Sequence, residues 1–259
     1  IAQFEDRQQL TVGLMNEALI RPTWHPNNRI RSIITTRHGG VSAAPYDTFN
    51  LASHVGDDKE RVLQNRKLLR QWLPAEPIWL TQVHSATVVD ARRVTEEHPV
   101  ADACLSDVQG CVLAVLTADC LPVLLANREA TVIAVAHAGW RGLVGGILEN
   151  TMQALMHRSP HSEWYAYLGP AIGPKAFEVG QDVFDAFAHS TKNSSTCFVK
   201  KPDSTKYVAN IYALAKERLN RVGVHRIDGG DACTVTDDRF YSYRREGVTG
   251  RMASLIWIE

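Results

Sequence analysis

Residues 111–138 read CVLAVLTADCLPVLLANREATVIAVAHA, three apolar runs separated only by short polar breaks. The runs at 111–117, 121–127 and 131–138 are short and apolar, which predicts three consecutive β-strands. Their apolar character on both faces indicates a sheet that is covered on both sides. Because strands follow one another here without an intervening helix, an α+β fold is favoured over a doubly wound α/β fold.

The rest of the chain adds more expected strands and a few expected helices. Asp57 stands three residues before Glu60 and is expected to form a capping box at the start of the first helix. The polar stretch 189–206 is interpreted as a long surface loop. The expected helices cover 56–74, 142–158, 179–188 and 207–224, and the further expected strands cover 30–36, 77–83, 86–94, 164–169 and 253–259.

Composition excludes several classes of protein. The chain has 259 residues, 45% hydrophobic content and no net charge, with no basic run of the kind that binds nucleic acid. No apolar stretch is long enough to predict a membrane span, and the first residues do not resemble a secretory signal. Five cysteines, an odd number without a CxxC pair, favour reduced thiols and a cytoplasmic protein. The oligomeric state is left open.

Three residues at the ends of apolar runs could bind a metal ion: His84, Cys120 and His137. Neutral imidazole and thiolate are zinc ligands, and a site with three protein ligands keeps a fourth position open for water or substrate. Such a His/Cys/His set would therefore be a catalytic zinc site and not a structural one.

Each of these residues also has a simpler interpretation. A histidine or cysteine at a strand end is more often packed and hydrogen-bonded than bound to metal. The spacings of 36 and 17 residues form no local zinc signature, so the residues alone leave both interpretations open.

Residues 137–150, HAGWRGLVGGILEN, join a glycine-rich turn to an amphipathic pattern. A helix beginning here would direct free N–H groups toward an anion, and Arg141 at its entry could pair with that anion. Alternatively, the glycines only let the helix pack closely on a sheet. The segment is neither a Walker motif nor GxGxxG.

Other catalytic signatures are absent from the sequence. The ten histidines include no HxH pair of the kind expected in a multicopper oxidase, so zinc is favoured over copper. The HxE…PCxxC pattern of zinc nucleobase deaminases is missing, and so are HExxH and GxSxG.

Ten segments, in order along the chain, resemble the YfiH-type family. This family is also called the laccase-like or multicopper polyphenol oxidase domain, the peptidoglycan editing factor family, and the purine nucleoside phosphorylase family related to mammalian FAMIN. The resemblance runs from about residue 30 to 259, with residues 1–25 outside the motifs, and we expect one domain over 1–259. The segments are TTRHGGVS, PYDTFNL, HVGDD, QVHSATV, LTADCLPVLLAN, VAHAGWRG, LGPAIGP, FEVG, DACT and FYSYRREGVTGRMASLIWI.

The resemblance implies an αββα layered sandwich of mixed sheets, shared with the cytotoxic necrotizing factor deamidases. It also implies a zinc ion held by the histidine of QVH, the cysteine of ADC and the histidine of HAGW, which here are His84, Cys120 and His137. The implied activities are phosphorolysis of adenosine, inosine, guanosine and methylthioadenosine, and deamination of adenosine.

The first hypothesis is therefore a zinc-dependent purine nucleoside phosphorylase with adenosine deaminase activity. Its catalytic and metal-binding residues would be His84, Cys120 and His137, and its small-molecule partners a purine nucleoside and phosphate. Arg37, Arg66 and Arg141 are the expected contacts to the anion and the ribose.

Two other classes of enzyme stay open. One is a Cys–His hydrolase that acts in peptidoglycan precursor editing, with Cys120 as the nucleophile and a histidine as its base. The other is a copper-dependent polyphenol oxidase. Asp119, next to Cys120, is expected either to orient a ligand histidine or to cap the turn.

Overall fold

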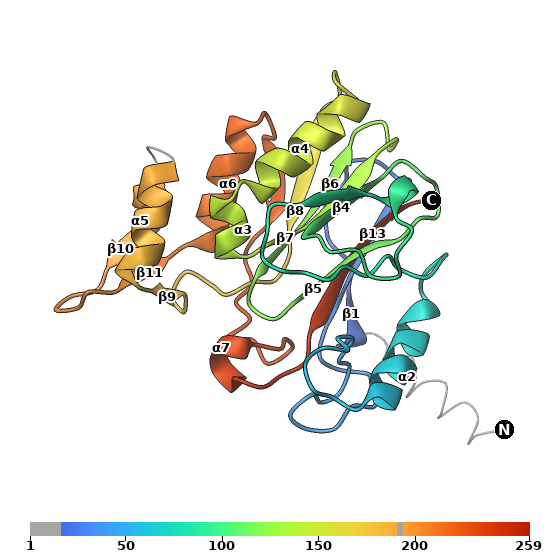
Figure 1. Ribbon diagram of the computed structural model, residues 1–259, viewed down its shortest axis with the longest axis horizontal. Coiled ribbons are helices and arrows are strands. Elements are labelled where there is room, and N and C mark those ends of the chain that lie inside the picture. The colour runs from blue at the N-terminus through green and yellow to red at the C-terminus, as the bar shows by residue number, and fades with distance from the viewer. Residues whose placement is uncertain (1–16, 191–193) are drawn as a thin grey trace.

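The computed structural model describes residues 17–190 and 194–259. Two β-sheets lie face to face, and helices cover the outer face of each (Figure 1). The chain thus has the expected α+β fold with four layers, helix–sheet–sheet–helix. None of the described helices is both long and apolar enough to cross a bilayer.

The larger sheet is mixed and has six strands in the order β12-β8-β6-β7-β4-β3. Its centre is antiparallel, whereas the edge strands β12 and β3 pair with their neighbours in parallel. The bounds are Val88–Asp90 for β3, Ala103–Ser106 for β4, Leu121–Asn127 for β6, Ile133–Ala138 for β7, Trp164–Leu168 for β8 and Arg226–Gly229 for β12.

The second sheet has four antiparallel strands in the order β1-β2-β13-β5. A third, small sheet in the order β10-β11-β9 stands with helix α5 at one side of the molecule (Figure 1). The bounds are Leu19–Ile20 for β1, Ile30–Thr35 for β2, Leu113–Thr117 for β5, Glu178–Val179 for β9, Phe198–Lys200 for β10, Tyr207–Ala209 for β11 and Met252–Ile258 for β13.

Helices α3, α4 and α6 pack on the outer face of the six-stranded sheet, and α2 packs on the outer face of the four-stranded sheet. The short helix α7 lies near the C-terminal strand. The bounds are Lys59–Arg70 for α2, Trp140–Val144 for α3, Ile147–Arg158 for α4, Gln181–Ser190 for α5, Ile211–Arg221 for α6 and Tyr243–Glu246 for α7, with 3₁₀ turns at Ala91–Arg93 and Ser194–Cys197.

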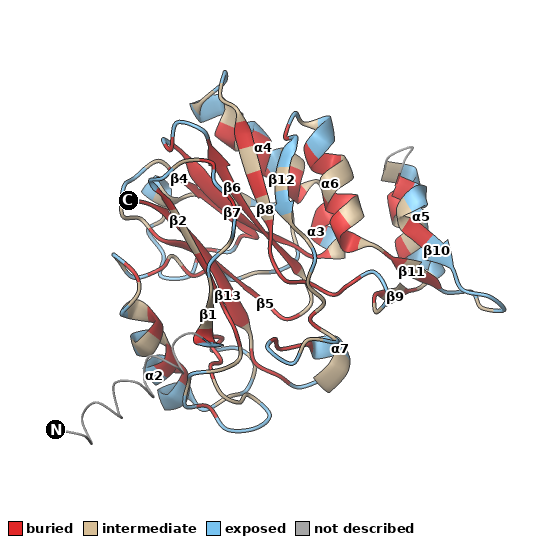
Figure 2. Cartoon of the chain, turned by 180° about the vertical axis from the view of Figure 1, so that it is seen from behind, coloured by how far each residue is buried: buried red, intermediate tan, exposed pale blue. Residues whose placement is uncertain are grey.

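The core is buried in three layers, which explains why the central strands are apolar on both faces (Figure 2). Side chains on a strand alternate between its two faces, so Leu124 of β6 packs between the sheets while Val123 and Leu125 pack against the helices. On β5, Val115 lies between the sheets and Ala114 faces the α2 side. The three strands predicted from residues 111–138 are therefore confirmed.

The expected strand at 77–83 is wrong. This segment makes only two isolated bridges, Ile78 to Leu113 and Thr81 to Val100. The side-chain amide of Gln82 instead donates to the carbonyl of Leu116 and accepts from its N–H, both at 2.8 Å. One side chain thus satisfies the edge of β5 where a neighbouring strand would otherwise pair.

Two helix predictions need correction. The first helix is capped by Asp58, which accepts from the Arg61 N–H, and not by Asp57. Asp57 is engaged elsewhere, because it accepts hydrogen bonds from Ser42 and Asn50. The expected helix 142–158 is two helices, because consecutive glycines, the second with φ of +87°, end α3 and begin α4.

The expected loop at 189–206 contains more regular structure than predicted in its described residues, 189–190 and 194–206. It holds the end of α5, a 3₁₀ turn and strand β10, which pairs with β11. Strands β1, β4 and β12 and the small sheet are missing from the sequence prediction, because short segments carry too little periodicity to identify.

Candidate metal centre

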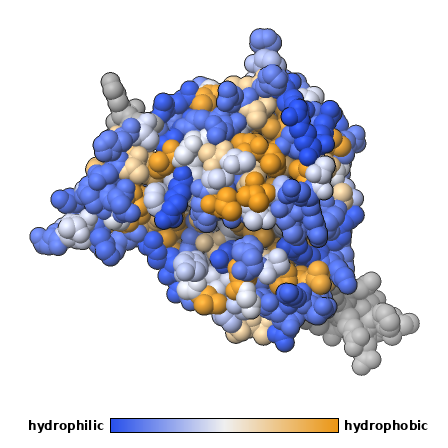
Figure 3. Space-filling view, viewed as in Figure 1, coloured by the Kyte–Doolittle hydropathy of each residue, from blue (hydrophilic) through white to orange (hydrophobic). Residues whose placement is uncertain are grey.

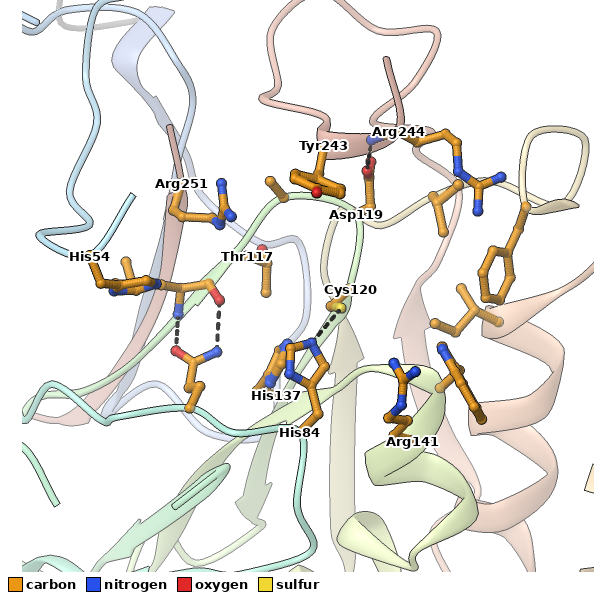
Figure 4. A pocket seen from close by; sticks show the side chains of 17 residues that line it. His54, His84, Thr117, Asp119, Cys120, His137, Arg141, Tyr243, Arg244 and Arg251 are labelled. Atoms are coloured by element: carbon orange, nitrogen blue, oxygen red, sulfur yellow. Dashed lines mark hydrogen bonds between the residues drawn. The ribbon is translucent and has the colours of Figure 1, made fainter. Parts of the chain in front are cut away.

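The structure brings His84, Cys120 and His137 together at one end of the six-stranded sheet (Figure 4). One ligand atom of each lies within 4.8 Å of the others. Cys120 Sγ is 3.8 Å from His84 Nε2, and the two imidazole rings lie edge to face with centroids 4.8 Å apart. Among the described residues, no other cluster of three or more histidine, cysteine or acidic side chains has this spacing.

Three local features of the backbone bring these side chains together. Cys120 lies in the turn between β5 and β6, after Asp119 with φ of +91°, and His137 lies opposite Pro122 in the β6–β7 pair. Gly139 leaves room beside them, because a Cβ at this position would stand 3.0 Å from Cys120 Sγ and 3.1 Å from His84 Cδ2.

Asp102, just before β4, is fully buried and contacts both histidines. Its Oδ1 accepts from His137 Nδ1 at 2.8 Å and from the His84 N–H at 2.9 Å. Its Oδ2 accepts from the N–H and the hydroxyl of Ser85, each at 2.7 Å. This residue was not predicted, because a lone aspartate in a buried strand segment resembles any other polar residue in the sequence.

The charges of the centre favour a thiolate. Burial raises the pKa of Cys120, but the charge and hydrogen bonds of His137, with those of His84, lower it to about 6. Burial lowers the pKa of His137, but the Cys120 thiolate and Asp102 raise it to about 9. Burial raises the pKa of Asp102, but its hydrogen bonds from His137 and Ser85 lower it to about 2. Each partner thus shifts the pKa of the other, toward the thiolate for Cys120 and toward the protonated ring for His137.

The donor set fits a single zinc ion. The bond to Asp102 puts the His137 proton on Nδ1, which leaves Nε2 free as a ligand. A thiolate and two imidazole nitrogens provide three ligands of the types zinc prefers and leave a fourth position for substrate.

A cavity of about 460 Å³ opens at this centre. A hollow with apolar side chains beside it is visible on the face shown in Figure 3. Arg251 and His54 lie on one side of the metal-ligand cluster, and Arg141 and Arg244 lie on the other (Figure 4). The lining residues are His54, Gln82, His84, Leu116, Thr117, Ala118, Asp119, Cys120, His137, Trp140, Arg141, Ile172, Phe177, Ile211, Tyr243, Arg244 and Arg251.

Of the three predicted arginines, only Arg141 lines this cavity. Its guanidinium lies 4.3 Å from the ring centroid of Trp140. Arg37 is bound to Glu246 at 2.6 Å and to Asp47 at 3.4 Å, and Arg66 donates to the carbonyl of Leu51 and lies over Trp79. A substrate contact by Arg37 or Arg66 therefore stays a prediction.

Arg251 and His54 line the cavity although the sequence did not single them out as ligand contacts. Arg251 Nη1 donates to the carbonyls of Thr249 and Gly250, and no carboxylate of the described residues lies within ion-pair distance of it. Burial, followed by the charges of Arg251 and Arg66, lowers the pKa of His54. In the sequence, His54 lies in the segment HVGDD and Arg251 in the segment FYSYRREGVTGRMASLIWI.

Asp119 does not contact either ligand histidine. Its carboxylate accepts from the Thr234 hydroxyl and from the Arg244 N–H, each at 2.6 Å. It thereby ties the Cys120 turn to α7 and to the segment around residue 234.

Comparison with known proteins gives a consistent family. The family described as multi-copper polyphenol oxidoreductase laccase matches residues 31–259. The chain is 47% identical to purine nucleoside phosphorylase YfiH of Escherichia coli over 243 residues, covering 93% of this chain and 98% of that protein. It is 46% identical to purine nucleoside phosphorylase PA4543 of Pseudomonas aeruginosa over 245 residues, covering 93% of this chain and 99% of the relative.

A solved structure agrees in fold. The crystal structure of protein NMB0706 of Neisseria meningitidis superposes with a TM-score of 0.88 at 48% identity, covering 93% of this chain and 99% of that one. The matches span nearly the whole length of both partners. The chain therefore belongs to the laccase-like YfiH family, which includes proteins named as purine nucleoside phosphorylases.

Proposed function

We propose that the protein is a cytoplasmic, zinc-dependent purine nucleoside phosphorylase that also deaminates adenosine. It would convert adenosine, inosine, guanosine or methylthioadenosine, with phosphate, to the base and ribose 1-phosphate. The observation that carries this proposal is a candidate three-ligand metal site that shares one cavity with three arginines, Arg141, Arg244 and Arg251, none of which has an ion pair with a described carboxylate. The names of the relatives support the same reaction class.

Zinc would be held by His84, Cys120 and His137, and when bound it would supply a Lewis acid beside the reacting atoms. Arg251 and His54 would bind the phosphate, because an uncompensated guanidinium next to an imidazole favours a dianion. Arg251 Nη2 and Nε donate to no described protein group, so these N–H groups can reach an oxyanion.

The nucleoside would occupy the side of the cavity away from Arg251. The cavity lining includes four apolar side chains, those of Trp140, Phe177, Ile172 and Ile211. Arg141, which lies on the side of the cluster away from Arg251 in Figure 4, stacks on Trp140 with its guanidinium 4.3 Å from the ring centroid. A flat purine gains from packing on aromatic and aliphatic surfaces, which exclude water from the glycosidic bond. Tyr243 of α7 stands over the centre and is 61% exposed, so its ring can cover a bound substrate.

The test is to incubate the zinc-loaded protein with inosine and phosphate and to measure ribose 1-phosphate and hypoxanthine. Both should form in equal amounts and only when phosphate is present. The same protein with adenosine, without phosphate, should form inosine if the deaminase proposal is right. A zinc-loaded protein that forms neither product from inosine would contradict the phosphorylase proposal.

A second candidate is a Cys–His hydrolase, favoured by the arrangement of Cys120, His137 and Asp102. The cysteine is activated by a histidine that a buried carboxylate holds in place, as in nucleophilic hydrolases. This enzyme would be active without metal and inhibited by zinc. Amide hydrolysis on peptidoglycan precursors by metal-free protein would support it, and dependence of all activity on zinc would contradict it.

The copper-oxidase alternative gains no support from the geometry. The described residues offer one cluster for one ion, whereas a multicopper oxidase needs several coppers held largely by histidine.

A further inference from the structure

The hydrogen bonds to the Asp102 side chain come from only two segments of the described chain. Every side-chain hydrogen bond of this buried carboxylate ends on residues 83–85 or on His137, the two segments that carry the histidine ligands. Its own carbonyl accepts from the His137 N–H at 2.7 Å, so His137 is held through both its backbone and its ring. A carboxylate that only filled the core would have no reason to bond solely to ligand segments.

The backbone conformation of His84 requires stabilising hydrogen bonds. His84 has φ of +60°, a left-handed conformation that a residue with a Cβ seldom adopts unless its surroundings hold it. Asp102 accepts from three consecutive N–H groups here, those of Val83, His84 and Ser85. These bonds hold the backbone turned so that the His84 ring faces Cys120.

For His137, the hydrogen bond to Asp102 determines which ring nitrogen carries the proton. A neutral imidazole has one protonated and one free nitrogen, and a carboxylate at Nδ1 puts the proton there. Nε2 is then the free donor atom. A neutral amide in place of the carboxylate could present its NH₂ to Nδ1, which would favour the other tautomer and remove the ligand.

We propose that Asp102 is the positioning residue of the metal centre, setting the backbone of one histidine ligand and the tautomer of the other with a single carboxylate. This inference rests on the proposed function only for the presence of zinc at His84, Cys120 and His137. It requires no particular substrate.

The test compares zinc affinity in Asp102→Asn with that in the matched control Ser85→Ala. Both variants remove a partner from the same hydrogen-bond group, but only the first alters the atoms that hold the two histidines. Competition with a chromophoric chelator should show a roughly 10- to 100-fold loss of zinc affinity in Asp102→Asn and a much smaller loss in Ser85→Ala. Wild-type affinity in a folded Asp102→Asn, or an equal loss in both variants, would overturn the proposal.

A second measurement needs no variant and covers the case in which Asp102→Asn does not fold. In the zinc-loaded wild type with ¹⁵N-labelled histidine, NMR should place the His137 proton on Nδ1 and the metal on Nε2. Metal on Nδ1 would overturn the proposal. Because these readouts report metal binding, a protein that lacks phosphorolysis but shows them would contradict the proposed function and leave the role of Asp102 intact.

Discussion

The His84–Cys120–His137 centre and the Arg251–His54 end of the same cavity differ in how their polar groups are satisfied. At the centre, Asp102 bonds to both histidines, and Cys120 Sγ lies 3.8 Å from His84 Nε2. At the other end, the hydrogen bonds that the Arg251 guanidinium makes to described residues go only to main-chain carbonyls. The centre is thus ordered before any ligand arrives, whereas the arginine keeps free donors that a substrate anion can use.

The largest expected effect is at the ordered centre. Cys120→Ser replaces the thiolate with a weak ligand, so zinc should be lost on dialysis and phosphorolysis should fall by roughly 100- to 1,000-fold, the size of one lost electrostatic stabiliser. Metal analysis and kcat/KM for inosine measure the two effects. Cys111→Ser, a partly exposed cysteine outside the cavity lining, is the control and should keep both. Full activity in Cys120→Ser would show that the centre is not catalytic.

The second effect tests the other end of the cavity. Arg251→Gln should raise the KM for phosphate about 10- to 100-fold, because a hydrogen bond to a charged group contributes roughly 1.5–3 kcal/mol. The KM for inosine and the zinc content should change little. Arg251→Lys should recover only part of the loss, since an ammonium lacks the planar fork. An unchanged KM for phosphate would place the anion elsewhere.

The third effect concerns the pH dependence of the thiolate. In metal-free protein the pKa of Cys120 is lowered to about 6, so its alkylation by iodoacetamide should rise about tenfold from pH 5 to pH 7 and level off above pH 7. An ordinary thiol would instead keep accelerating up to pH 9. Mass spectrometry of the Cys120 peptide follows the rate. Cys104, which is buried with its pKa raised to about 12, is the internal reference and should stay unmodified.

The smallest effect separates Arg37 from Arg251. Because Arg37 is neutralised by Glu246 and Asp47, Arg37→Gln should lower the free energy of unfolding by about 1 kcal/mol and leave the KM for phosphate unchanged. Thermal unfolding of one preparation measures the change in stability, and phosphate kinetics on the same preparation measure the KM. A raised KM for phosphate would instead support the substrate contact predicted for Arg37 from the sequence.

The two regions were not equally predictable from the sequence. The strands around residues 111–138 follow from local patterns, since they depend on alternation and on the points where apolar runs stop. The same patterns marked His84, Cys120 and His137 only as residues that could bind a metal or be packed and hydrogen-bonded, and it was the family resemblance that favoured the metal site. The contrast between Arg37 and Arg251 depends on partners far along the chain. Glu246 lies 209 residues from Arg37 in the sequence. No local pattern shows that Glu246 pairs with Arg37 and not with Arg251.

Other errors have local physical causes. The helix expected over 142–158 is divided in two because Gly146 adopts a positive φ. Glycine permits this conformation but does not require it, so the sequence alone does not show the division. The strand expected at 77–83 failed because one side chain, Gln82, satisfies the edge of β5. Asp102 could be found only from the fold, since it serves residues 17 to 35 positions away.

Gly139 limits how this site can be redesigned. The backbone at this position lies so close to Cys120 and His84 that there is little room for a Cβ. Any side chain introduced there would therefore press on these two residues before it contacted a substrate. A library that aims at new substrates should therefore vary the walls at Ile172, Phe177 and Ile211 and keep position 139 constant.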